Sequence, residues 1–226
     1  MAKIFIVIAA YNEENSIGSV LDSLQQEGYK NIVVVDDGSG DRTYSVALRH
    51  KAIVIQHPIN RGQGAALKTG IEYALLQGAE IIVTFDADGQ HNPRDIKAMV
   101  APLLKKEADI TLGSRYIKQG KTNAPLLRRI YHRIGVFTIW LMYGVRLTDA
   151  HNGLRALSRK AAEAIEIKSD RMEHASEIVD QIGKKHLRFR EIPVEIRYTE
   201  YSLRHGQSSA NAFNIVFRMI FKKLVR

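Results

Sequence analysis

Two carboxylates, Asp86 and Asp88, stand one residue apart directly after the apolar run 81–85. Such a run is typical of a buried parallel strand, and ligands of open α/β sheets bind at the carboxyl ends of the strands. Two carboxylates in one small space repel each other unless a cation joins them. The spacing therefore indicates a site for Mg²⁺ or Mn²⁺, which would in turn hold a diphosphate. Taken alone, the pattern would equally fit a solvated turn at the end of a strand.

A second acidic pair, Asp36 and Asp37, follows the apolar run 32–35. Adjacent carboxylates at a strand end suit the recognition of ribose hydroxyls and a base N–H, and the glycines that follow permit a tight turn. Asp41 is expected to cap the helix that begins near Thr43. A second acidic strand end in the same sheet strengthens the interpretation of the first.

The first predicted strand ends beside an aromatic and an acidic residue. Tyr11 offers a flat ring for stacking on a base, and Glu13 offers acceptors for base or ribose groups. Ser16 is expected to cap the next helix. The segment 60–66, where small residues precede a helix, could form an anion cradle. Its glycine spacing disfavours a Rossmann dinucleotide site, and the sequence contains no P-loop motif.

Apolar runs and amphipathic stretches alternate around these residues. Strands are predicted at 4–9, 32–35, 52–56, 81–85 and 110–113, and helices at 16–26, 43–49, 64–77 and 93–105. That order gives βαβ units with right-handed crossovers. We therefore predict an α/β fold with a mostly parallel central sheet flanked by helices.

The pattern changes after residue 115. The sequence predicts, in order, a helical stretch at 125–143, a loop and strand at 149–158, helices at 159–165 and 174–185, a strand at 188–197, a polar loop at 198–209 and a helix at 211–225. We interpret residues 1–226 as one domain. Its expected parts are a nucleotide-binding half (1–115), an acceptor-binding half (116–209) and an amphipathic C-terminal helix (210–226).

The composition is that of an ordinary globular chain of 226 residues, with 45% hydrophobic and 25% charged residues. The absence of cysteine excludes disulfides and thiolate metal sites. The longest apolar stretch, 134–145, is shorter than the roughly 18 to 20 residues that span a bilayer, and the N-terminal stretch is too short for a signal peptide. The net charge of +9 implies a polyanionic partner: a phosphate-bearing substrate, an anionic membrane surface or a nucleic acid.

Five segments occur in the order found in one known family. They are Ile-Ala-Ala-Tyr-Asn-Glu from Ile8, Val-Asp-Asp-Gly-Ser from Val35, Asn-Arg-Gly-Gln-Gly-Ala from Asn60, Phe-Asp-Ala-Asp-Gly-Gln-His from Phe85 and Gly-Ser-Arg from Gly113. Together they resemble the family 2 glycosyltransferases of GT-A fold, and most closely the dolichyl-phosphate mannosyltransferase and polyprenyl-phosphate sugar transferase branch. The resemblance is close over residues 4–115 and looser over 115–209.

The resemblance implies roles on the donor side by position. The residues implied to hold the nucleotide-sugar are Ala10, Tyr11, Glu13, Asp37, Asp86, Ala87 and Arg204. The residues implied to ligate a divalent cation, Mg²⁺ or Mn²⁺, are Asp86, Asp88 and Gln90. Arg204 lies in a segment that resembles the loop Arg-x-x-Gly-x-Ser-Lys of this branch, which folds over the diphosphate. Ser209 replaces the expected lysine, so Arg204 is the favoured phosphate clamp and His205 a second candidate.

On the acceptor side, the resemblance implies that Arg115 and an arginine of the pair 128–129, for which we favour Arg129, grip a phosphate. A guanidinium fork suits that task, although the pair also fits a solvated helix start. Asp149 is the candidate general base, which is needed only if the acceptor is a sugar hydroxyl, because a lipid phosphate is already ionised. Otherwise Asp149 would order its loop or contact sugar hydroxyls. The catalytic candidates are thus Asp88, Arg115 and Asp149.

The activity implied is that of an inverting, metal-dependent hexosyltransferase that moves a sugar from a UDP- or GDP-sugar to dolichyl or undecaprenyl phosphate. The alternative is a family 2 enzyme that extends a cell-envelope polysaccharide on a sugar hydroxyl. A nucleic-acid-binding module would leave the acidic strand ends unexplained. The expected location is cytoplasmic and peripheral on the inner face of the membrane. There, 134–145 and the C-terminal helix could dock on anionic lipid, and a small membrane protein could be a partner.

Overall fold

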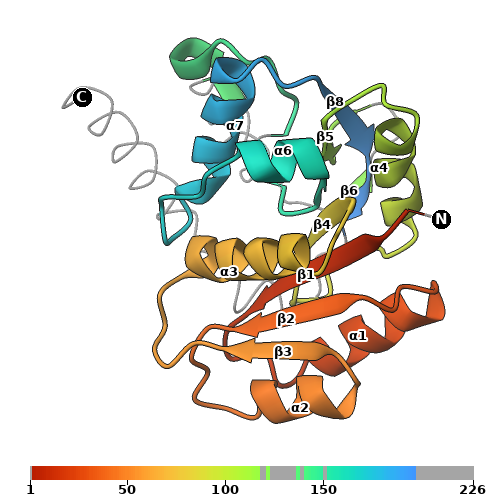
Figure 1. Cartoon of the computed structure of the whole chain (residues 1–226), viewed down its shortest axis with the longest axis vertical. Helices are drawn as coiled ribbons and strands as arrows, with labels where there is room; N and C mark the ends of the chain where they lie inside the picture. The colour runs from red at the N-terminus through yellow and green to blue at the C-terminus, as the bar shows by residue number, and fades with distance from the viewer. Residues whose placement is uncertain (1, 118–120, 123–135, 138–139, 150–151, 197–226) are drawn as a thin grey trace.

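The computed structural model describes residues 2–117, 121–122, 136–137, 140–149 and 152–196. Its main sheet has seven strands in the order β3-β2-β1-β4-β7-β5-β8 (Figure 1), and a second sheet pairs β6 with β9. The strands are β1 Ile4–Ala10, β2 Ile32–Asp36, β3 Ile53–Gln56, β4 Ile81–Asp86, β5 Ile110–Ser114, β6 Lys121–Thr122, β7 Arg155–Ser158, β8 Phe189–Pro193 and β9 Glu195–Ile196.

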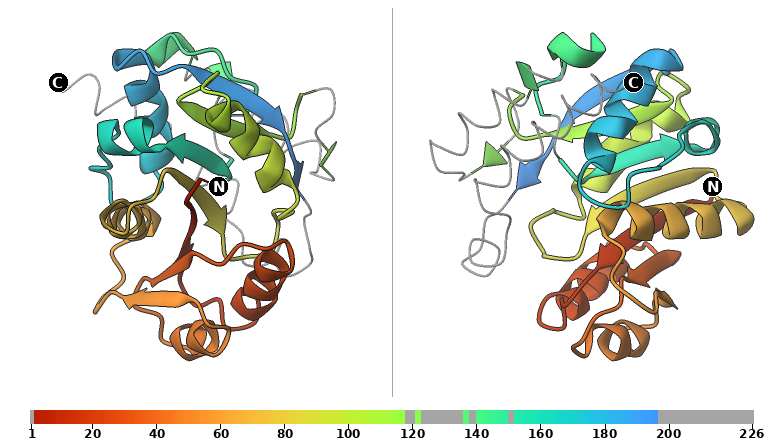
Figure 2. Two further views of the ribbon diagram at one scale, coloured as in Figure 1. Left: turned by 45° about the vertical axis from the view of Figure 1, so that its right-hand side comes forward. Right: turned by 90° about the vertical axis from the view of Figure 1, so that its left-hand side faces the viewer.

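Helices cover both faces of the main sheet and make three layers (Figure 2). One face carries α1 (Ile17–Gln26), α2 (Thr43–Arg49) and α4 (Asp95–Leu104), and the other carries α3 (Gln63–Leu76), α6 (Arg159–Ala164) and α7 (His174–Lys184). Successive side chains of a strand point to opposite faces, so each inner strand is apolar on both sides. That is why these strands could be recognised as continuous apolar runs.

The expected α/β fold with a mostly parallel central sheet is confirmed. β1 is parallel to both β2 and β4, β2 to β3, and β5 to β8. The exception is β7, which lies antiparallel between β4 and β5. Because β7 runs the other way, its first residue, Arg155, pairs with Thr84 near the carboxyl end of β4. The loop before β7 therefore reaches the edge of the sheet that carries the acidic strand ends.

The single strand predicted at 188–197 is wrong, because the structure divides it into β8 and β9. Ser114, the last residue of β5, pairs with Pro193, and the Ser114 carbonyl then accepts the N–H of Val194 at 3.0 Å. The ladder with β5 stops there, and β9 pairs with β6 instead. Most of the helix predicted at 125–143 lies outside the described residues. The predicted loop at 198–209 and the predicted helix at 211–225 lie wholly outside them.

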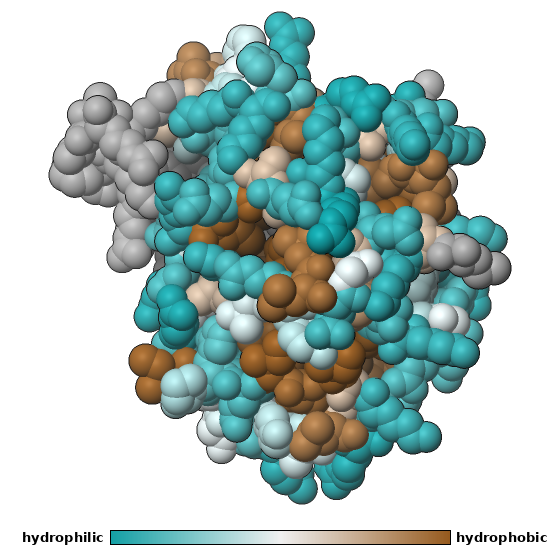
Figure 3. Space-filling view, in the orientation of Figure 1, coloured by the Kyte–Doolittle hydropathy of each residue, from teal (hydrophilic) through white to brown (hydrophobic). Residues whose placement is uncertain are grey.

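The face of the molecule in Figure 3 is mainly hydrophilic, with apolar side chains gathered in smaller areas between polar ones. Three large apolar side chains from the segment 134–145, namely Phe137, Trp140 and Leu141, are exposed. The guanidinium of Arg146 lies 5.4 Å from the centre of the Trp140 ring. None of the helices in the described part of the chain is long and apolar enough to cross a membrane.

Candidate active site

A cavity of about 480 Å³ lies at the carboxyl ends of β1, β2 and β4. The strand register explains its acidity, since Ala9 pairs with Asp86 on one side of β1 and Ala10 pairs with Asp36 on the other. The predicted donor-side residues that line this cavity are Ala10, Tyr11, Glu13, Asp37, Asp86, Ala87 and Asp88. Residues up to 78 positions apart in the sequence thus meet in one site. A volume of this size suits a small-molecule ligand.

Asp86 is held in place by two side chains. Nε2 of His91 donates to Oδ2 of Asp86 at 2.8 Å, and Nε2 of Gln63 donates to Oδ1 at 3.3 Å. Burial alone would raise the pKa of Asp86, but the interaction with His91 and the nearby charge of Arg155 outweigh it, so the pKa lies below its ordinary value. Asp86 is therefore ionised and oriented before any ligand binds.

Asp88 is held by Gln90, whose backbone N–H donates to Oδ1 at 3.0 Å and whose side-chain amide donates to Oδ2 at 2.8 Å. Burial and the negative charge of Asp86 raise the pKa of Asp88 to about 6. The two carboxylates therefore form a site of concentrated negative potential. A positive ion placed between them would relieve the repulsion.

The oxygen ligands that these side chains offer are of the chemical type that a hard divalent cation prefers. Asp86 and Asp88 supply carboxylate oxygens, and Gln90 has an amide oxygen once its amide group turns away from Asp88. Within the described residues no three side chains of His, Cys, Asp or Glu are arranged to hold a metal by themselves. An ion here would therefore need oxygens from a ligand or from water to complete its coordination, as Mg²⁺ usually does.

Asp37 is buried and accepts three hydrogen bonds from the loop after β3. Nδ1 of His57 lies 2.7 Å from Oδ1, and the backbone N–H groups of Arg61 and Gly62 donate to Oδ1 and Oδ2 at 3.1 and 2.6 Å. Nε2 of His57 lies 2.9 Å from the Thr69 hydroxyl, which fixes the imidazole from its other side. Asp37 therefore fixes the loop as well as lining the cavity.

These bonds change the interpretation of the segment 60–66. The N–H groups of Arg61 and Gly62 bind the chain's own Asp37, and the N–H of Ala65 donates to the Asp170 carbonyl at 3.0 Å. The expected anion cradle is thus filled internally. A Cβ on Gly64 would lie 2.1 Å from the Ser169 carbonyl, so the small residue is needed for close backbone packing.

Each of the two predicted caps is met only in part. The N-cap position of α2 is Arg42, but Oδ1 of the preceding Asp41 accepts the N–H of Thr43 at 2.9 Å. Ser16 occupies the N-cap position of α1, but its side chain makes no capping bond. Its hydroxyl donates instead to the backbone carbonyl and the carboxylate of Glu13. Ser16 therefore orients Glu13 at the rim of the cavity.

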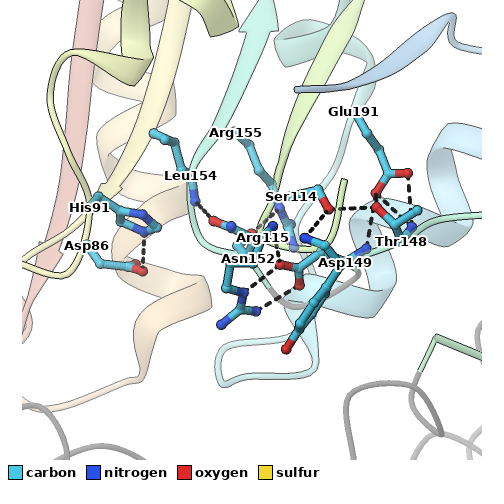
Figure 4. A network of polar contacts seen from close by, with 11 residues as sticks. Asp86, His91, Ser114, Arg115, Thr148, Asp149, Asn152, Leu154, Arg155 and Glu191 are labelled. Atoms are coloured by element: carbon cyan, nitrogen blue, oxygen red, sulfur yellow. Dashed lines mark hydrogen bonds and ion pairs between the residues drawn. The ribbon is translucent and has the colours of Figure 1, made fainter. Parts of the chain in front are cut away.

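On the far side of β7, Arg115 and Asp149 form a buried ion pair (Figure 4). Nε and Nη2 of Arg115 donate to the two oxygens of Asp149 at 2.6 and 2.8 Å, and the Arg115 N–H donates at 3.2 Å. Their side chains are 8% and 0% exposed. Behind the pair, Glu191 binds the backbone of Thr148 and Asp149, and Thr148 bonds Ser114. The two acceptor-side candidates are thus paired with each other.

Three residues of the site, Arg155, His174 and Asn152, are not among the candidates from the sequence. Arg155 is buried, and burial lowers its pKa to about 10, although the negative charges of Asp86 and Asp149 act to raise it. Burial and the charge of Arg155 lower the pKa of His174 to about 4, so this cavity residue is neutral at pH 7. Asn152 also lines the cavity, and its buried Nδ2 has no partner among the described residues. Arg155 and Asn152 reach the cavity because β7 pairs antiparallel with β4, a pairing that no local sequence pattern records.

Four candidates for phosphate binding lie outside the described residues, namely Arg128, Arg129, Arg204 and His205. Their predicted roles at the acceptor phosphate and the diphosphate remain predictions.

The site and the three-layer sheet together define an enzyme of the GT-A glycosyltransferase class. The model of the family described as Glycosyl transferase family 2 matches residues 5–166. The chain belongs to this family and is a glycosyltransferase, as the five ordered segments indicated.

Two archaeal proteins are similar over nearly the whole chain. A UDP-N-acetylglucosamine–dolichyl-phosphate N-acetylglucosaminyltransferase of Methanococcus voltae is 36% identical, with 98% of this chain and 96% of that protein covered. An uncharacterized protein of Methanocaldococcus jannaschii is 45% identical, with 98% and 93% covered. Among solved structures, a glucosyl-3-phosphoglycerate synthase from Mycobacterium tuberculosis in complex with Mn²⁺ and uridine-diphosphate-glucose has a TM-score of 0.75 at 19% identity. That likeness covers 97% of this chain and 77% of that one and shows the shared fold.

Proposed function

We propose that this glycosyltransferase moves a sugar from a nucleoside-diphosphate sugar to a polyprenyl phosphate, dolichyl or undecaprenyl, at a membrane surface. The observation that carries the proposal is the buried pair of Arg115 and Asp149 beside the acidic cavity. The similarity to a dolichyl-phosphate N-acetylglucosaminyltransferase supports the same acceptor class.

The cavity suits the donor. Tyr11, which is 48% exposed, presents a ring to a base, and Glu13 and Asp37 present oxygens to base and ribose groups. Asp86 and Asp88 would hold a divalent cation together with the diphosphate, with help from Gln90. When bound, that cation stabilises the charge that develops on the departing nucleoside diphosphate. Arg204 is our candidate for the same charge on the protein side.

The acceptor side favours a phosphate over a sugar hydroxyl. A hydroxyl acceptor needs a base, but both oxygens of Asp149 already accept hydrogen bonds from Arg115. A lipid phosphate needs no base and would be attracted by Arg115, joined by Arg129 in this proposal. The attack is then a single displacement at the anomeric carbon: the phosphate oxygen forms the new bond as the bond to the nucleoside diphosphate breaks, with inversion.

A lipid acceptor requires the enzyme to reach a membrane. Phe137, Trp140 and Leu141 are exposed and lie close in sequence to Arg146, which contacts the Trp140 ring. Aromatic and basic side chains in one place suit the interface of an anionic bilayer. We propose that this segment docks the enzyme peripherally, on the inner face of the membrane. Flotation with anionic liposomes tests this, and recovery of the protein only in the unbound fraction would contradict it.

The proposed activity is tested by label transfer. Purified protein with Mn²⁺ or Mg²⁺ is offered radiolabelled UDP- and GDP-sugars together with undecaprenyl or dolichyl phosphate. Label that enters the organic phase with wild-type protein, and not with Asp88→Ala, is the expected result and names the donor. Binding of a nucleotide-sugar with transfer only to saccharides would refute the lipid acceptor and return Asp149 to the role of a base.

A further inference from the structure

Glu191 lies on β8, outside the cavity, yet its carboxylate holds the loop that contains Asp149. The N–H of Thr148 lies 2.8 and 2.9 Å from the two carboxylate oxygens, and the Thr148 hydroxyl donates to one of them at 2.9 Å. The N–H of Asp149 donates to the same oxygen at 3.1 Å. One carboxylate thus satisfies two consecutive backbone donors and a hydroxyl, which fixes both the position and the direction of this loop.

The loop in turn sets the plane of a guanidinium. Asp149, held through its N–H, receives the bidentate fork of Arg115. A bidentate pair has one geometry, so a movement of Asp149 must move the Arg115 side chain with it. Ser114, next to Arg115, is joined to Thr148 at 2.6 Å, which closes the link from β5 back to the same loop (Figure 4).

The sheet makes Glu191 a rigid support. Glu191 pairs with Leu112 in the parallel ladder of β5 and β8, two residues before Ser114 on β5. Glu191 therefore stands on the same sheet as β5, whose last residue, Ser114, directly precedes Arg115. Rigid strands position a site more precisely than loops do.

We propose that Glu191 is a positioning residue for acceptor binding, which it supports through Thr148, Asp149 and Arg115. The inference rests on the proposed acceptor phosphate, and it adds a residue that contacts neither substrate. Glu191→Gln removes the charge and, even with its carbonyl oxygen kept at the two N–H groups, places an NH₂ group at the oxygen that lies 2.9 Å from the Thr148 nitrogen. Loss of hydrogen bonds to a charged group predicts a rise of about 10- to 100-fold in the KM for polyprenyl phosphate. The KM for the nucleotide-sugar should change less than about twofold, since the donor cavity is lined by other residues.

The control is Glu107→Gln. Glu107 pairs with Arg190, the neighbour of Glu191 in sequence, at 2.7 Å on the surface, so the same chemical change occurs outside the site. It should leave both KM values unchanged. Equal rises of both KM values in Glu191→Gln, with a lower melting temperature, would show a merely structural role and overturn the inference.

A second measurement does not depend on the acceptor. In protein with ¹⁵N-labelled arginine, the Nε–H signal of Arg115, assigned by its loss in Arg115→Lys, should exchange slowly with water. Exchange should be at least about tenfold faster in Glu191→Gln, and unchanged exchange would overturn the inference. If wild-type protein transfers no sugar to any polyprenyl phosphate, the proposed function fails, while the exchange rate still decides whether Glu191 positions Arg115.

Discussion

The substitution Gly153→Ala tests whether the placement of Asp86 is essential. A Cβ at position 153 would lie 2.3 Å from Oδ2, 2.5 Å from Oδ1 and 2.7 Å from Cγ of Asp86. The Gly153 carbonyl also accepts the Thr84 hydroxyl at 2.6 Å, which ties this backbone to β4. The side chain of Asp86 can rotate more freely than the backbone of Gly153. The carboxylate is therefore expected to move, while the backbone stays in place.

The magnitude follows from the contact distances. Ordinary van der Waals separations are about 3.5 Å, so the carboxylate has to move by about 1 Å. That movement breaks its bond to His91 and takes it away from the position at which it would meet the cation and diphosphate. A misplacement of about 1 Å at a catalytic centre can cost about 100-fold in rate. Overpacking at one site costs about 1 to 3 kcal/mol in the free energy of unfolding, so the protein should remain folded.

The assay measures kcat/KM for label transfer beside thermal unfolding followed by circular dichroism. We expect a loss of about 100-fold with a folded protein, whereas Gly40→Ala, at a glycine with open space around it, should behave as wild type. In the double variant with Asp86→Ala, Gly153→Ala should add little, because both act on the same carboxylate. Wild-type activity in Gly153→Ala, or full additivity in the double variant, would refute the reasoning.

Three other substitutions probe the cation, the nucleoside and the fold. Asp88→Ala should abolish Mn²⁺ binding in calorimetry and metal-dependent turnover without changing the circular dichroism, and full activity in EDTA would contradict the metal assignment. His57→Phe should weaken UDP or GDP binding about tenfold in calorimetry, because Asp37 loses its buried donor; an unchanged Kd would contradict this. Hydrogen bonds from Arg188 lower the pKa of Asp109 to about 2, although burial acts in the opposite direction. Ionised Asp109 therefore stabilises the fold above about pH 4, and this stabilisation is lost as the pH falls towards 2. Since Arg188 is exposed, Asp109→Asn should cost about 1 to 2 kcal/mol in urea unfolding at pH 7 and almost nothing near pH 2; an equal cost at both would exclude the ion pair as the cause.

The grouping of the acidic strand ends around one cavity could be predicted because it follows from local pattern. Buried parallel strands are apolar on both faces, so each strand end is visible as the point where polar residues begin. All strands predicted up to residue 113 are present, with ends within one residue of those expected. The common direction of β1, β2 and β4 then brings their carboxyl ends to one edge. The cavity residues from Ala10 to Asp88 could therefore be grouped without knowing any contact between them.

The acceptor side could not be predicted in the same way, because its residues meet through pairing between distant segments. Arg115 and Asp149 are 34 positions apart, and Glu191 is a further 42 positions along the chain. The family resemblance marks Arg115 and Asp149 one by one but not their contact, and Glu191 is visible only as a polar residue of a predicted strand. The sequence makes Asp149 a candidate base. Its ion pair with Arg115 depends on the course of a loop, and the spacing of apolar residues does not indicate that course.

The antiparallel strand β7 joins the acidic cavity to the region of Arg115 and Asp149. Because this pairing is between distant segments, the sequence did not reveal the connection. The start of β7 brings Arg155, with its preceding loop, between β4 and β5. Arg155 remains protonated at neutral pH despite its burial, and the charges of Asp86 on the donor side and Asp149 on the acceptor side both favour its charged form. A single buried cation thus interacts with a carboxylate of each region. Any shift of β7 would therefore disturb donor and acceptor binding together, which makes this strand the structural link between the two halves of the proposed reaction.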